Sequence, residues 1–137
     1  MTTTYATDAQ VYDRSPLAAS ALAAVNATLT AGGQSTTTLD AYRVEAKRQI
    51  LIALRLKGIL TEAQISRPAD LQEPEICLAL ALLYEASAQR VNPRAGAQDL
   101  FAQNALLWRD TYVRSLAAAA PVSGVKPAGR SFSWGRG

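Results

Sequence analysis

Few side chains in this sequence could carry out acid–base, nucleophilic or metal chemistry. The chain has no histidine, and its single cysteine, Cys77, lies in an apolar run at 76–80 that is typical of a buried helix. The most closely spaced carboxylates, Asp70, Glu73 and Glu75, fit the negative charge that favours a helix start better than they fit a metal site. No glycine-rich loop follows a strand pattern to hold a phosphate. We therefore expect no enzyme, no cofactor and no bound metal.

The strongest binding signal lies in the last residues, 121–137. The chain carries 14 basic and 11 acidic residues, and its net charge of +3 is due to three basic side chains that meet no acid there: Lys126, Arg130 and Arg136. Phe132 and Trp134 stand two apart, so an extended backbone places both rings on one face. The rest is mostly Gly, Pro and Ser, which cannot bury enough surface to order itself.

We interpret this tail as an anchor that docks on another chain, with five contact residues: Lys126, Arg130, Phe132, Trp134 and Arg136. The alternative is a disordered end whose aromatic rings fold back on their own domain. The neutral residues before it, 1–120, are numerous enough for one domain with a single core. The longest apolar run, 76–83, is far shorter than the roughly 20 residues that span a bilayer, so we expect a soluble chain.

Start and stop signals predict an all-α bundle of four to five helices. Thr7 and Gln10 form a capping box, Ser15 and Pro16 read as a cap and a first helical residue, and Gly58 is a left-handed stop. Thr61 and Gln64 repeat the capping box before a single turn, with Leu60 packing on Ile65. The expected helices span 7–14, 16–29, 39–57, 71–90 and 97–119, and residues 92–96 break the last two apart.

Apolar spacing predicts which helix faces are buried. The helix at 71–90 is almost continuously apolar from Ile76 to Ala86, which indicates the central core helix. The last helix repeats large or small apolar residues at three- and four-residue spacing: Phe101, Ala105, Trp108, Tyr112 and Leu116. In the helix at 39–57 the apolar residues from Ile50 to Leu56 surround most of the circumference, which predicts burial on more than one side.

The helix at 39–57 is also the most basic one. Four of its cations are candidates for facing a channel or DNA: Arg43, Lys47, Arg48 and Arg55. A solvated face is the favoured interpretation, and a nucleic-acid contact is the alternative.

This layout resembles the small head-to-tail connector proteins (adaptor, or head completion) of tailed bacteriophages. The resemblance covers roughly residues 5–120 and rests on four stretches: YATDAQV at 5–11, the basic and apolar helix at 42–56, LQEPEICLALALLYEA at 71–86, and the final helix at 100–116 with WRDTY at 108–112. The segment at 15–29 and the threonine-rich loop after it depart from that pattern.

The resemblance implies a structural virion protein at the neck, made in the host cytoplasm. It implies a dodecameric ring around the DNA channel, with the portal protein on one side and a stopper or tail-completion protein on the other, and an extended C-terminal segment that reaches a neighbour or the portal. Contact with packaged DNA would be transient and non-specific, because the DNA must pass. No contact with a membrane is expected.

Two other functions remain open from the sequence. A small helical DNA-binding protein, such as a packaging or regulatory subunit, would use the cations of the third helix, and its affinity would fall steeply with salt. An ordinary monomeric bundle with a floppy tail would assemble with nothing.

Overall fold

The computed structural model describes residues 4–59, 61–90 and 97–119, and this part of the chain is entirely α-helical apart from its loops. The elements, in order, are α1 (Asp8–Arg14), α2 (Ala18–Ala31), α3 (Leu39–Leu56), the short 3₁₀ turns η1 (Glu62–Gln64) and η2 (Pro68–Leu71), α4 (Gln72–Arg90) and α5 (Ala97–Ala118). The predicted small all-α bundle is therefore confirmed. The tail at 121–137 and the break at 92–96 lie outside the described residues.

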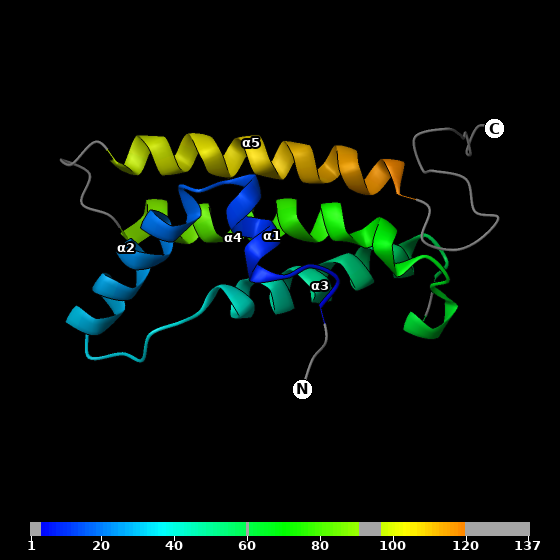
Figure 1. Cartoon of the computed structure of the whole chain (residues 1–137), viewed down its shortest axis with the longest axis horizontal. Coiled ribbons are helices and arrows are strands. Elements are labelled where there is room, and N and C mark those ends of the chain that lie inside the picture. The colour runs from blue at the N-terminus through cyan, green and yellow to red at the C-terminus, as the bar shows by residue number, and fades with distance from the viewer. Residues whose placement is uncertain (1–3, 60, 91–96, 120–137) are drawn as a thin grey trace.

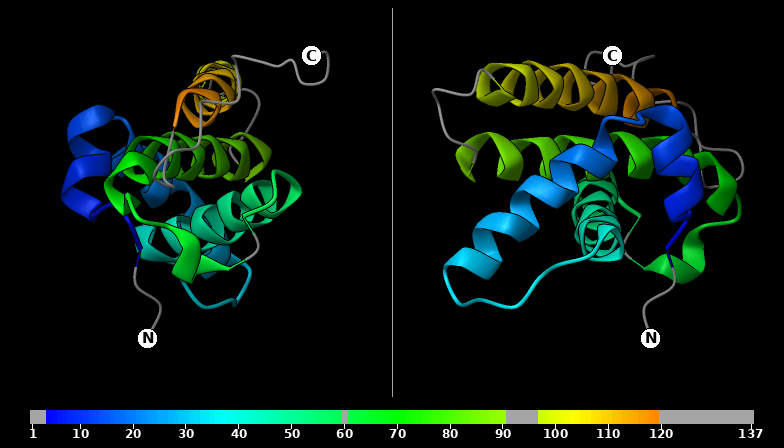
Figure 2. Two further views of the ribbon diagram at one scale, coloured as in Figure 1. Left: turned by 90° about the vertical axis from the view of Figure 1, so that its right-hand side faces the viewer. Right: turned by 60° about the vertical axis from the view of Figure 1, so that its left-hand side comes forward.

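Helix α4 is the centre of the bundle. Figure 1 shows α5 running alongside α4 as an outer layer, with α3 on another side of α4, and Figure 2 shows the same arrangement from two further directions. Helices α1, α2, α3 and α5 all pack on α4, and the α4–α5 pair makes the most extensive contact. Two groups of buried side chains lie around α4, one shared with α1, α2 and α5 and the other with α3, η2 and the end of α5.

Most of the predicted core residues of α4 and α5 are buried, whereas Leu82, Ala86, Trp108 and Tyr112 are partly buried at the edges of the core. Cys77 and Leu80 are completely inaccessible, and Phe101, Ala105 and Leu116 of α5 face α4. Burial raises the pKa of the Cys77 thiol to about 12, so this cysteine is an inert core side chain. The apolar spacing of both helices thus predicted their inner faces correctly.

Local end signals fix several helix termini. The Gln10 amide donates to Thr7 Oγ1 at 3.3 Å, and Gln10 Oε1 accepts from the Thr7 amide at 2.9 Å, which is the expected capping box. Thr38 caps α3 by accepting from the Ala41 amide, and Gly58 ends it with φ +94°. The turn after Thr61 is present as η1, whereas Leu60 lies outside the described residues.

The predicted cap at Ser15 is wrong. Helix α2 begins at Ala18 without a side-chain cap, and the Ser15 hydroxyl instead bonds the hydroxyl of Tyr84. Tyr84 is completely buried in α4, and a buried phenol needs a hydrogen-bond partner. The Ser15 hydroxyl therefore serves Tyr84 and does not cap α2.

The second half of α3 also departs from the prediction. Ile50 and Leu54 are buried as expected, but Ile52 and Leu56 are exposed, Leu56 by 87%. Only one side of this segment packs against α4, so its apolar circumference is not buried on more than one side within a single chain.

Candidate partner-binding surfaces

The predicted tail anchor lies outside the described residues, so the structure places none of its five residues: Lys126, Arg130, Phe132, Trp134 and Arg136. The candidate surfaces in the described part of the chain are therefore the basic helix α3, the exposed apolar faces and the surface hollows.

Arg43 of α3 is a structural residue. Its side chain is only 10% exposed, and its guanidinium donates from Nε to Asp8 at 2.7 Å and from Nη2 to Asp40 at 2.8 Å. Its Nη1 donates to the Ala6 carbonyl at 2.5 Å and also bonds Thr4 Oγ1. All three guanidinium nitrogens of Arg43 donate hydrogen bonds within the chain, so this side chain is not available to bind a partner.

Lys47, one turn further along α3, is also buried. Its Nζ lies 2.8 Å from Glu62 Oε2 and 4.9 Å from the centre of the Tyr5 ring, in a cation–π contact. The Tyr5 hydroxyl donates to the same carboxylate at 3.0 Å. Hydrogen bonding from Lys47 lowers the pKa of Glu62, which keeps this carboxylate ionised as the shared acceptor.

Glu75 of α4 completes this arrangement from the other side. The carboxylate is completely buried and accepts the backbone N–H of Tyr5 at 2.9 Å and of Ala6 at 2.8 Å. Burial raises the pKa of Glu75, although the two backbone donors and the charges of Arg43 and Lys47 act in the opposite direction. We call the set Arg43, Lys47 and Glu75, which together hold residues 4–6, the N-terminal clamp.

The clamp corrects two interpretations of the sequence. Arg43 and Lys47 belong neither to a solvated face nor to a surface that faces DNA, because both side chains are buried and are paired with Asp8, Asp40 and Glu62. Arg48 is exposed but pairs with Glu45, lowering the pKa of that carboxyl to about 2. Arg55 is exposed and makes no ion pair among the described residues. The four predicted cations therefore do not form one basic surface.

Two helix faces expose large apolar side chains. On α5 these are Leu100, Leu106, Leu107 and Val113, with Leu106 exposed by 74%; we call them the α5 outer face. At 3.6 residues per turn they form two stripes about 120° apart, Leu100 with Leu107 and Leu106 with Val113, and the ion pair of Asp110 and Arg114 lies between the stripes. Ile52 and Leu56 form the α3 outer face. The inner side of α5 packs on α4, and Figures 1 and 2 show that α5 forms the rim of the bundle, with no described element beyond it.

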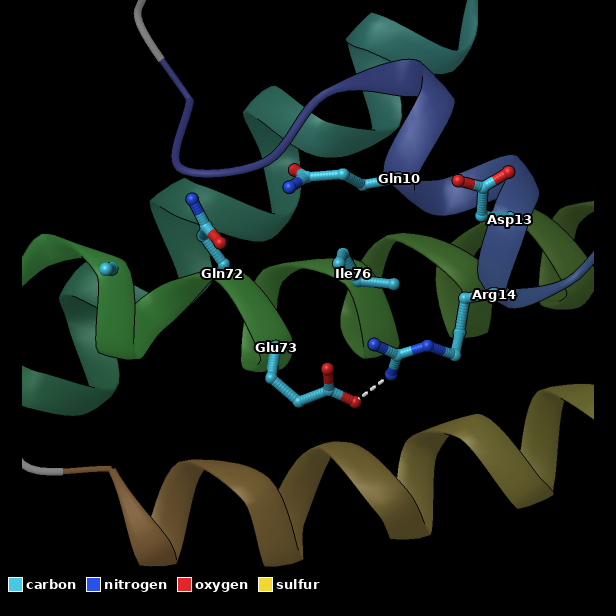
Figure 3. Close-up of a pocket in the computed structure, with 7 residues that line it drawn as sticks. Gln10, Asp13, Arg14, Gln72, Glu73 and Ile76 are labelled. Carbon is cyan, nitrogen blue, oxygen red and sulfur yellow. Dashed lines mark hydrogen bonds and ion pairs between the residues drawn. The ribbon is translucent and has the colours of Figure 1, made fainter.

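The surface hollows offer little chemistry. Figure 3 shows one of about 350 Å³ between α1 and α4, where Arg14 pairs with Glu73 beside Gln10, Asp13 and Gln72. The ion pair occupies two of its three charged groups, Asp13 being the third, and no serine, threonine, cysteine or lysine lines the hollow. A second hollow of about 360 Å³ lies between α2, α3 and α4 and is mostly apolar, lined by Val25, Leu29, Thr37, Ala41, Tyr42, Glu45 and Leu82.

Within the described ranges, no three side chains able to bind a metal come together, and no helix is long and apolar enough to cross a bilayer. Comparison with known proteins gave no match to a protein-family model, to a curated protein or to a solved structure.

Proposed function

We propose that this chain is a structural virion protein, the head-to-tail connector of a tailed phage or phage-derived particle. Copies pack side by side into a ring, expected to be dodecameric, beneath the portal and around the DNA channel. The observation that carries the proposal is the α5 outer face: four large apolar side chains are exposed on one helix, which among the described residues packs only on its inner side.

Such a face favours assembly over a solitary bundle. Large apolar residues exposed together on one element mark interaction surfaces, whereas single ones are ordinary. Burying a large aliphatic side chain contributes about 1.5–3 kcal/mol, so covering what these four expose supplies several kcal/mol for each contact. One such contact is weak between two chains, but a closed ring repeats it at every boundary.

The partners follow from the family that the sequence resembles. The tail at 121–137, with Phe132 and Trp134 as anchors, fastens the ring to the portal or to a neighbour, and a stopper or tail-completion protein binds the opposite side. DNA passes the ring with transient, non-specific contacts only. The protein acts by binding, and no bond is made or broken.

The structure gives less support to DNA recognition by α3. Such a role needs several free cations on one surface. Arg43 and Lys47 are instead buried in the N-terminal clamp, where they pair with carboxylates of the same chain. Arg48 forms an ion pair with Glu45.

Light scattering with a candidate portal tests the proposal. The full chain should form a large, discrete complex with the portal, and a chain truncated after Ala120 should lose it. The variant Leu106→Glu should remain helical but fail to assemble, whereas Ala23→Glu, at an exposed position of α2, is the matched control and should assemble normally. A full chain that stays monomeric with portals at high concentration would overturn the proposal, and salt-sensitive binding to duplex DNA would then favour the DNA-binding alternative.

A further inference from the structure

We infer that neighbouring copies join head to tail, with the α5 outer face of one copy packed on the α3 outer face of the next. The inference rests on the proposed self-assembly and specifies its geometry. The occupant of each apolar face is therefore a second copy of this chain.

The placement of the two faces is the first argument. Helices α3 and α5 both pack on α4, from different sides (Figures 1 and 2). Ile52 and Leu56 stand two positions beyond Ile50 and Leu54, roughly 200° around a helix of 3.6 residues per turn, so they point away from α4. The two outer faces of one copy therefore cannot cover each other.

Symmetry is the second argument. Two unlike patches on different sides of a molecule make a heterologous contact, which generates a ring when the rotation between copies closes. If α5 paired with α5, the contact would be isologous, would stop at a dimer and would leave Ile52 and Leu56 exposed. Head-to-tail packing places Ile52 and Leu56 of one copy against α5 of the next with a single type of contact.

Charge supplies the third argument. Arg55 lies beside Leu56 and has no ion pair in the described part of the chain, while Asp110 lies within one turn of Leu106 and Leu107 on α5. Within the described ranges the ion-pair partner of Asp110 is the exposed Arg114 of its own helix, and exposed pairs of this kind contribute little. In the head-to-tail contact Arg55 of one copy pairs with Asp110 of the next.

Covalent trapping distinguishes these arrangements. A chain carrying Leu56→Cys is mixed with a differently tagged chain carrying Leu107→Cys, under conditions where light scattering detects the assembled species, and is mildly oxidised. A mixed disulfide dimer is expected, because a disulfide forms only when the two Cα atoms come within about 7 Å. A chain with both substitutions should give a ladder of covalent multimers. Cys77 is buried and does not interfere, and Ala23→Cys replaces Leu107→Cys in the control.

Four results would overturn the inference. Dimers from Leu107→Cys alone, without the mixed product, mean that α5 pairs with α5. Assembled species without any cross-link mean that the ring uses other surfaces, and the proposed function stands. A rise in the reactivity of Leu107→Cys towards a thiol reagent on truncation after Ala120, measured in monomeric chains before assembly, means that the tail covers α5. The absence of any assembled species would overturn the proposed function as well.

A charge swap provides a second, independent measurement. Asp110→Arg should weaken assembly at least several-fold, and adding Arg55→Asp in the same chain should restore it. A double variant that is no better than Asp110→Arg alone contradicts the contact between these residues.

Discussion

Replacing Glu75 by glutamine should destabilise the protein far more than the same change at Glu73, two residues away on α4. Glu75 is completely buried and accepts two backbone N–H groups, from Tyr5 and Ala6. Glu73 is partly exposed and its charged partner is Arg14 at the surface. The two positions differ in burial and in partners but share a helix turn and a side-chain chemistry.

The expected magnitude follows from these bonds. A hydrogen bond to a charged group contributes about 1.5–3 kcal/mol, and a buried donor left without an acceptor costs about 1–3 kcal/mol. The amide of Glu75→Gln keeps one oxygen for one backbone donor and turns an NH₂ group towards the other. The neutral glutamine no longer carries the cost of a buried charge, which offsets part of this loss. We therefore expect Glu75→Gln to lower the free energy of unfolding by about 2–4 kcal/mol. For Glu73→Gln, a surface ion pair predicts about 0–1 kcal/mol.

Urea denaturation at pH 7, followed by circular dichroism, measures the free energy of unfolding of both variants. Small domains typically have a free energy of unfolding of about 5–15 kcal/mol. Hydrogen exchange at the Tyr5 and Ala6 amides gives a local measurement, and both amides should exchange faster in Glu75→Gln only. Equal losses for the two variants, with unchanged exchange at residues 5 and 6, would refute the role assigned to the clamp.

Four further outcomes are expected. Leu80→Asp should unfold the bundle, because an unpaired buried carboxylate costs several kcal/mol, and a helical, soluble variant would contradict the core assignment. Arg43→Ala leaves the buried Ala6 carbonyl without its donor and should lower the free energy of unfolding by about 1–3 kcal/mol, measured by denaturation, whereas a DNA-contact role predicts weaker duplex binding at unchanged stability. Because the pKa of Glu62 is lower in the folded than in the unfolded chain, its contribution is present above the unfolded value of about 4.3 and is lost as pH falls through the folded one; Glu62→Gln should therefore flatten the acid limb of a stability–pH curve. Trp134→Ala should leave stability unchanged but reduce portal attachment in a pull-down, and normal attachment would count against the tail anchor.

Short-range signals predicted most of the helix ends. Thr7 with Gln10, Thr38 and Gly58 act through neighbours within a few residues, so their local sequence contains the whole interaction. Helix spacing likewise placed Leu80 and Phe101 in the core. Ser15 was wrongly predicted as a cap because its partner, Tyr84, is 69 residues away.

The clamp was not predicted for the same reason. Glu75 reads as a helix-start charge and Arg43 as a surface cation until residues 4–8 are placed between them, and no periodicity encodes that placement. One signal was available in retrospect: Arg43 shares the inner face of α3 with Ala46 and Ile50, and a cation on an apolar face needs a buried partner. The exposed apolar faces could not be predicted either, since spacing identifies apolar residues without saying which ones a single chain covers.

The central position of α4 also constrains how the protein is made. Helices α1, α2 and α3 leave the ribosome first, yet the helix on which all of them pack is synthesised only after residue 71. Tyr5 must remain available until Glu75, 70 residues later, can accept its amide. Local contacts form faster than distant ones, so we expect the α4–α5 pair, which makes the most extensive contact, to form before the first half of the chain packs on it. The nascent N-terminal half therefore lacks the α4 side chains that both buried clusters contain, and we expect a chain that stops before α4 to be degraded or held by chaperones.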